Sequence, residues 1–227
     1  YSASGALWAA HAALRKLGIA RVDDHGIIHG KAMVVGATGA IGSVCARLLA
    51  LVTDELWLVS PETAKLLAIK KDIESENPRA VLHVTARPGD ALAEMDLIVT
   101  ATSAAGNKVL DIMKVKPGCV ITDVARPLDM SAEDVAKRPD VLVIESGEIE
   151  LPGDVHMGNI GLPAGVAYAC LAETVVLALE GRYETFTVGR NIEWPTVSYT
   201  HLRAHETVLD LVCRLLLEKK KTHQSVA

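Results

Sequence analysis

The sequence predicts an α/β fold in which helices flank a doubly wound parallel sheet. Short apolar runs alternate with helix-forming segments at the spacing of βαβ units. A glycine-rich turn also joins one of these runs directly to the helix that follows it. The 227 residues are 50% apolar and 22% charged, a balance that allows a sizeable buried core and excludes disorder for the bulk of the chain.

The predicted elements begin with an Ala/Leu-rich helix at residues 2–17, which Gly18 ends. Apolar runs typical of buried strands then follow at 31–36, 55–60, 81–85, 96–101, 119–123 and 141–144. Helices are predicted after the first two of these strands, at 41–51 and 62–74. A long helix is predicted at 163–181, because Pro163 suits a first helical turn and Gly181 suits a helix end.

Composition and charge exclude several classes of function. The net charge of −5 and the aromatic content of 4% argue against a nucleic-acid surface. The most apolar stretch, 160–179, contains Pro163 and Glu173, so we predict no membrane span. Four widely spaced cysteines without a CxxC pair predict neither a disulfide framework nor a zinc site, and they suit the reducing cytoplasm: Cys45, Cys119, Cys170 and Cys213.

The glycine-rich turn is the strongest functional signal. It reads Gly36-Ala37-Thr38-Gly39-Ala40-Ile41-Gly42 between a predicted strand and a predicted helix. Glycines there allow a tight turn, a close approach of a pyrophosphate and close helix packing, while the helix N-terminus favours an anion. We therefore predict a dinucleotide-binding domain of the Rossmann type, with cofactor contacts from Gly36, Thr38, Gly39, Ala40, Ile41 and Gly42. The alternative is a glycine turn that binds nothing.

Other strand ends complete the predicted cofactor site. Ser60 ends the second strand, where a hydroxyl suits a 2′-phosphate and Lys65 adds positive charge, so the sequence favours NADPH without excluding NADH. Alternatively, Ser60 only caps the following helix. Small residues after the later strands border the expected crevice and are further predicted contacts: Ala101, Thr102, Ser103 and Val124. An ordinary polar turn explains them equally well.

Cys170 combines two opposing signals. In the predicted long helix it shares an apolar face with Glu173, and such local conflicts cluster at functional sites. Free cysteines are nevertheless usually buried packing residues, which is also how we interpret Cys45 and Cys119. The predicted helix places Cys170 in its interior, away from the N-terminal position where the dipole favours a thiolate.

Residues 169–192, ACLAETVVLALEGRYETFTVGRNI, resemble the C-terminal region of the long-chain acyl-ACP reductases best known from cyanobacteria. The resemblance extends to VVGATGAIGS at 34–43 and KLGI at 16–19. It implies that NADPH reduces a fatty acyl thioester, on acyl carrier protein or CoA, to the aldehyde. It also implies that Cys170 is the catalytic nucleophile and that Glu173 orients or exchanges a proton with neighbouring groups. Arg190 would then pair with a carrier or nucleotide phosphate, or form only a surface salt bridge.

Three segments depart from that family, so cofactor and acyl preference stay open. Pro61 stands where an arginine follows the second strand, residues 123–127 replace a GGYP-type segment, and residues 148–152 replace a histidine-containing one. Two rival functions therefore stay open. One is an amino-acid or shikimate-type dehydrogenase, which needs no cysteine, and the other is a nucleotide-binding module without chemistry. No oligomeric state is predicted.

The ends of the chain shape the expected domain organisation. The chain begins with Tyr1, so we expect a fragment in which 1–24 is the remainder of a substrate domain. The nucleotide domain is expected at 25–160 and the cysteine helix with its closing segment at 161–196. Residues 197–221 resemble a translated sequencing adapter, so we expect 197–227 to be a non-native tail and predict no metal site from His201, His205 and Cys213. An amphipathic C-terminal helix is the alternative.

Overall fold

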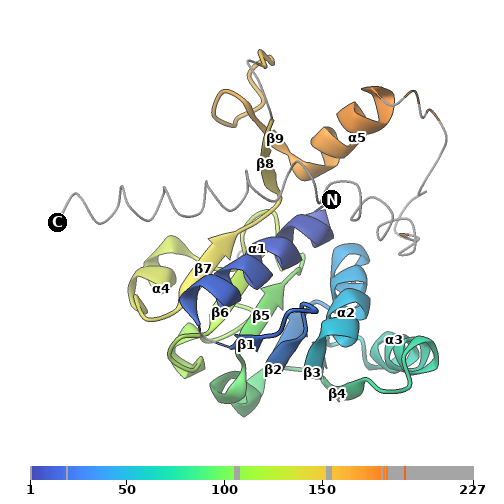
Figure 1. The fold of residues 1–227 in the computed structure, drawn as a ribbon. Coiled ribbons are helices and arrows are strands. Elements are labelled where there is room, and N and C mark those ends of the chain that lie inside the picture. Colours follow the sequence, from blue (N-terminus) through green and yellow to red (C-terminus); the bar gives the residue numbers. More distant parts are fainter. Residues whose placement is uncertain are drawn as a thin grey trace.

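The computed structural model describes residues 2–18, 20–104, 108–151, 155–179, 181, 183 and 192. Its centre is a sheet of six parallel strands in the order β4-β3-β2-β5-β6-β7 (Figure 1). The short strand β1 (Arg21–Val22) joins the sheet antiparallel to β2. The parallel strands are β2 (Ile28–Val35), β3 (Thr53–Val59), β4 (Val81–Thr85), β5 (Leu97–Thr100), β6 (Val120–Asp123) and β7 (Leu142–Glu145). The order reverses between β2 and β5, which confirms the doubly wound α/β fold.

Three helices cover one face of the sheet: α1 (Ser2–Leu17), α2 (Ala40–Val52) and α3 (Thr63–Glu76). Because strand side chains alternate between faces, Ala32 and Val34 of β2 pack toward these helices. Leu14 of α1 is fully buried in the same core, so the N-terminal helix packs directly on the parallel sheet. The domain boundary expected near residue 24 stays a prediction.

The opposite face has a thinner cover. It carries the 3₁₀ turns η1 (Gly89–Glu94) and η2 (Ile112–Lys114) and the short helix α4 (Ala132–Ala136). Met33 and Val35 of β2 pack into this second core. Both faces of the second half of β2, Ala32–Val35, are therefore buried, which explains why this half is continuously apolar.

The long helix predicted at 163–181 is wrong at its start. Strand β9 (Val166–Tyr168) instead pairs antiparallel with β8 (Glu148–Glu150), and helix α5 (Ala169–Leu179) begins only after it. Gly165 has a φ of +77°, a left-handed conformation that a right-handed helix cannot pass through. The amide of Leu151 also donates to the Gly165 carbonyl at 2.8 Å.

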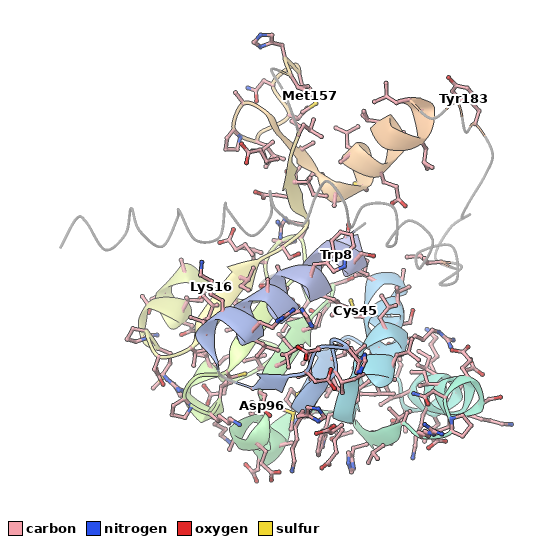
Figure 2. The ribbon with its side chains drawn as sticks, viewed as in Figure 1. Trp8, Lys16, Cys45, Asp96, Met157 and Tyr183 are labelled. Atoms are coloured by element: carbon pink, nitrogen blue, oxygen red, sulfur yellow. The ribbon has the colours of Figure 1, made fainter. Side chains whose placement is uncertain are left out.

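Strands β8 and β9 and helix α5 form an arm that stands away from the sheet (Figure 1). Met157 and Tyr183 lie at the outer ends of this arm (Figure 2). Its own core is small, with buried side chains from Ile149, Ala169 and Ala172. The amide of Ala169 donates to the Gly147 carbonyl at 2.8 Å, which fixes the first residue of α5 at the base of the arm.

No helix in the described part of the chain is long and apolar enough to cross a bilayer. The tail expected at 197–227 lies outside the described residues.

Candidate functional site

A cleft opens at the carboxyl edge of the parallel sheet, where the strand order reverses. It consists of a larger cavity of about 860 Å³ and a smaller one of about 460 Å³. Five residues line both cavities, so the two adjoin: Gly39, Ala40, Ala101, Thr102 and Ser103. Crevices at this position of doubly wound sheets bind ligands.

The glycine turn forms the wall that the two cavities share. Gly36 has a φ of +89°, and a Cβ there would lie 2.5 Å from the Ala101 carbonyl oxygen. A Cβ on Gly42 would lie 2.8 Å from the Gly36 carbonyl carbon, so Gly42 serves close packing of α2. Gly39 is the N-cap of α2 and provides no side-chain cap. The first turn of α2 therefore presents uncapped amides beside the cleft, an arrangement suited to a phosphate.

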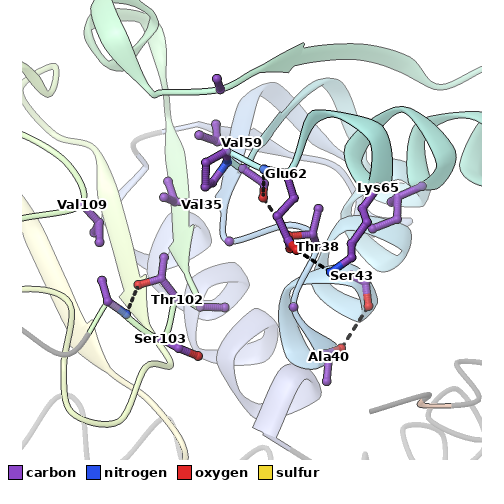
Figure 3. A pocket seen from close by; sticks show the side chains of 18 of the residues that line it. Val35, Thr38, Ala40, Ser43, Val59, Glu62, Lys65, Thr102, Ser103 and Val109 are labelled. Atoms are coloured by element: carbon purple, nitrogen blue, oxygen red, sulfur yellow. Dashed lines mark hydrogen bonds and ion pairs between the residues drawn. The ribbon is translucent and has the colours of Figure 1, made fainter. Parts of the chain in front are cut away.

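A polar cluster at the end of β3 lines the larger cavity (Figure 3). The Thr38 hydroxyl lies 2.7 Å from the Ser60 hydroxyl and donates to a Glu62 carboxylate oxygen at 2.8 Å. Lys65 forms an ion pair with the other Glu62 oxygen. Ser60 is only 3% exposed, and its hydroxyl also accepts the Glu62 amide at 3.2 Å. Glu62 and Lys65 are thus two charged groups beside Ser60, the residue predicted to meet a 2′-phosphate.

Two arginines also line the larger cavity. Arg47 on α2 forms ion pairs with Glu76 at 2.6 Å and Asp72 at 3.4 Å. Arg87 follows the end of β4. Arg87 is not among the contacts predicted from the sequence, although the rule that ligands gather at the carboxyl ends of strands would have identified it.

Two carboxylates hold the loops at the ends of β5 and β6. Asp129 accepts the Thr102 amide at 3.1 Å and also the Thr102 hydroxyl. Asp123 is fully buried and accepts the amides of Ala125 at 3.1 Å and Met130 at 2.8 Å. Burial raises the pKa of Asp123 above its usual value, although the two amides act in the opposite direction. These bonds keep the segment after β6 folded against the smaller cavity.

Cys170 is exposed and lines the smaller cavity. It is the second residue of α5, so the prediction that it lies inside a long helix is wrong. The strand pairing of β9 displaces the helix start to Ala169 and brings the sulfur to the N-terminal turn, where the helix dipole favours negative charge. Cys45 and Cys119 are buried as predicted, and burial raises the pKa of each thiol to about 12.

The structure brings most of the predicted site residues together. Gly36, Thr38 and Ser60 line the larger cavity, Ile41, Val124 and Cys170 line the smaller one, and the five shared residues line both. Gly42 and Glu173 are not among the described residues that line either cavity. Arg190 lies outside the described residues.

The smaller cavity also contains residues that the sequence patterns did not assign to the site: Ser2, Ala125, Arg126, Ser146, Gly147 and Tyr168. Arg126 and Ser146 follow the ends of β6 and β7. The rule that ligands gather at the carboxyl ends of strands could therefore have identified both residues from the sequence. Tyr168 ends β9 and could not be placed without knowing that hairpin. Among the described residues, no group of three or more His, Cys, Asp or Glu side chains is arranged to hold a metal ion.

Comparison with known proteins gives two informative sequence relatives, while no family model matches the chain. The chain is 35% identical over 167 residues to the aminotransferase PigE of a Serratia species, covering 69% of this chain and 19% of that protein. It is 30% identical over 166 residues to the long-chain acyl-[acyl-carrier-protein] reductase of Synechococcus elongatus, covering 70% of this chain and 46% of that protein. The chain thus spans less than half the length of either relative.

Solved structures show more distant likeness. Quinate dehydrogenase from Corynebacterium glutamicum, in complex with NAD, has a TM-score of 0.46 and 19% identity over 61% of this chain and 50% of that one. Shikimate 5-dehydrogenase from Listeria monocytogenes, in complex with shikimate and NAD, has a TM-score of 0.43 and 17% identity over 62% of this chain and 52% of that one. The fold assignment rests on the strand order of this chain.

Proposed function

We propose that this protein is a nicotinamide-dependent oxidoreductase that reduces a fatty acyl thioester to an aldehyde through Cys170. The observation that carries the proposal is the position of Cys170 in the smaller cavity, which adjoins the larger cavity at the glycine turn. The similarity to the Synechococcus acyl-ACP reductase supports the same reaction. PigE is matched over only 19% of its length, so its named activity is not transferred to this chain.

The larger cavity fits a dinucleotide. The uncapped first turn of α2 suits the pyrophosphate, and Gly39 leaves that approach free of a side chain. Glu62, Lys65 and Arg87 would surround the adenosine ribose at the far end. Lys65 and Arg87 favour the 2′-phosphate of NADPH, the proposed cofactor, whereas the Glu62 carboxylate favours the free hydroxyl of NADH. When bound, the cofactor supplies the hydride that reduces the acyl group.

Cys170 would perform the acyl transfer. Its exposed sulfur lies in the first turn of α5, and thiolates are natural nucleophiles toward thioesters. The sulfur bonds to the carbonyl carbon, the bond from that carbon to the carrier sulfur breaks, and the carrier thiolate leaves and takes up a proton. After reduction, the bond to Cys170 breaks, the aldehyde leaves and the thiolate is restored. The thioester of acyl carrier protein or CoA is the proposed substrate.

Two further residues keep supporting roles in the proposal. Glu173 lies one helical turn after Cys170 and is half-buried, a position from which it could orient groups near the sulfur. Arg190 is proposed to meet a carrier or nucleotide phosphate.

Aldehyde formation in Cys170→Ala tests this function. The protein is incubated with decanoyl-CoA and NADPH, and aldehyde is trapped with a hydrazine. We expect loss of at least about 100-fold in Cys170→Ala, because the covalent route is removed. The matched control is Cys45→Ala, a buried cysteine outside both cavities, which keeps activity within about twofold once folded. Full activity in Cys170→Ala would favour a dehydrogenase without a cysteine, and nucleotide binding without turnover would leave only a binding module.

A further inference from the structure

We propose that Arg126 binds the carbonyl oxygen of the thioester and stabilises the oxyanion that forms when Cys170 attacks. This inference rests on the function proposed above and adds to it a specific electrophilic residue. Arg126 comes from the loop after β6, whereas Cys170 comes from the arm, so only the folded protein brings both residues to the same cavity.

Arg126 provides the positive charge of the smaller cavity. It is the one charged side chain among the described residues that line this cavity, which also include Cys170, Ser146 and Tyr168. Its side chain is 36% exposed and lines the cavity, so the residue is accessible to a ligand there. Thioester chemistry at Cys170 generates negative charge on oxygen in the same small volume. A preorganised cation at such a position stabilises that charge.

Three contacts hold the guanidinium in place. Nη1 donates to the Ala125 carbonyl at 2.9 Å, and Nη2 donates to the Ser146 carbonyl at 2.8 Å. Nη2 also lies 3.2 Å from a carboxylate oxygen of Glu148 on β8. These contacts fix the plane of the group between the sheet and the arm, so little reorganisation is needed when a ligand arrives.

The braced guanidinium still has hydrogen-bonding capacity. An arginine side chain has five N–H donors, and the contacts to Ala125, Ser146 and Glu148 use three of them. The Nε–H and one Nη1–H thus donate to no other group among the described residues. Each of these N–H groups can donate a charge-assisted hydrogen bond to a ligand oxygen. A carbonyl oxygen that becomes an oxyanion is such a ligand.

The step balances in atoms and charge. The Cys170 thiolate supplies the electron pair of the new carbon–sulfur bond, and the carbonyl π pair moves onto oxygen. The negative charge therefore moves from sulfur to the oxygen that Arg126 binds. When the tetrahedral intermediate collapses, the same charge leaves with the carrier thiolate, and Arg126 returns to binding a neutral carbonyl.

A comparison of two reactions at the same sulfur tests the proposal without any nucleotide. Acylation of Cys170 by decanoyl-CoA passes through an oxyanion, whereas alkylation by iodoacetamide does not. Both rates are measured by mass spectrometry of the Cys170 peptide in wild type, Arg126→Gln and Arg126→Lys. We expect acylation to slow by about 100-fold in Arg126→Gln, the scale found for loss of an oxyanion donor. We expect a smaller loss in Arg126→Lys, which keeps the charge, and alkylation rates within about threefold of wild type.

The control is Arg79→Gln, which removes an exposed arginine that lines neither cavity and should change neither rate. Parallel slowing of acylation and alkylation in Arg126→Gln would overturn the proposal, because Arg126 would then only position the arm. Wild-type acylation in Arg126→Gln would overturn it as well. If wild type itself forms no acyl adduct, the proposed function fails, and this outcome is distinct from an adduct that is indifferent to Arg126.

Discussion

The glycine turn and the arm that carries Cys170 contribute to one cleft but are built very differently. The turn lies between β2 and α2, whose apolar side chains are buried in cores on both faces of the sheet. The arm has only a small apolar cluster of its own, formed by Ile149, Ala169 and Ala172, and Glu148 at its base forms an ion pair with Arg126. The glycine-turn side of the cleft is therefore fixed by extensive packing, whereas the cysteine side has far less packing of its own.

The two halves of the cleft should therefore respond differently to the same substitution. A side chain added in the glycine turn would contact backbone atoms that cannot move without disturbing the main core. A change in the arm meets open space or a loop. Four substitutions probe that contrast, beginning with the largest expected effect.

Gly42→Ala should have the largest effect on folding. Its methyl group would lie against the Gly36 carbonyl, which belongs to backbone rather than to a flexible side chain. We expect the free energy of unfolding, measured in urea, to fall by about 3 kcal/mol. The control is Gly158→Ala in the arm, where a Cβ meets no atom within 4 Å, and there we expect a change within about 0.5 kcal/mol. Equal losses of unfolding free energy at the two sites would show that the turn and the arm do not differ in packing.

Gly39→Val should instead affect binding more than folding. A Cβ at this position would lie 3.3 Å from the Gly36 carbonyl oxygen, a contact that small shifts relieve. The added branches would occupy the approach to the α2 N-terminus. We expect NADPH affinity, measured by fluorescence titration, to fall about 100-fold, or about 2.7 kcal/mol. An unchanged dissociation constant would show that the turn does not receive the pyrophosphate.

Glu62→Gln should change cofactor preference without changing the fold. The carboxylate lies in the cluster with Thr38 and Lys65, where it would repel a 2′-phosphate. We expect the ratio of NADPH affinity to NADH affinity to rise about tenfold. The corresponding change in binding free energy is close to the Coulomb energy of two nearby charges in water. Glu133→Gln, on the exposed surface of α4, should leave the ratio unchanged. A fall in the affinity ratio would show that the 2′-phosphate does not bind beside Glu62.

Asp123 should give the smallest effect, visible as a pH dependence. Its pKa is raised in the folded protein, chiefly by burial. A raised carboxyl pKa means that the folded state holds the proton more tightly, so this contribution to stability is present at low pH and is lost as pH rises through the folded pKa. The stability advantage of wild type over Asp123→Asn should therefore shrink as the pH rises above about 4, the ordinary range of an aspartate, in urea titrations. An advantage that grows over that range would contradict the burial argument.

The same contrast explains which features the sequence could predict. The glycine turn and the six parallel strands depend on local patterns, namely apolar runs, glycine spacing and helix-forming segments. The start of α5 depends on pairing between β8 and β9, which lie apart in the chain, and on the left-handed conformation of Gly165. Pro163 gave a valid local signal for a helix start, but the pairing of β9 overrode it.

The residues of the candidate site show the same contrast between local patterns and contacts that depend on the whole fold. Ser60 and Cys170 were identified from local position or resemblance, but their surroundings were not. The hydroxyl of Ser60 is engaged with Thr38, and Cys170 shares its cavity with Arg126 from a different strand end. Contacts between distant strand ends depend on the order of the strands, and no single segment encodes that order.

The most direct test of catalysis through Cys170 is a pulse and chase in wild-type protein. The protein is first incubated with decanoyl-CoA alone, and NADPH is then added while intact mass and aldehyde are measured together. We predict one decanoyl group on Cys170 before the chase, followed by its loss in step with an equal amount of aldehyde. An unmodified Cys170, or an adduct that persists after NADPH is added, would contradict a thioester intermediate on this cysteine.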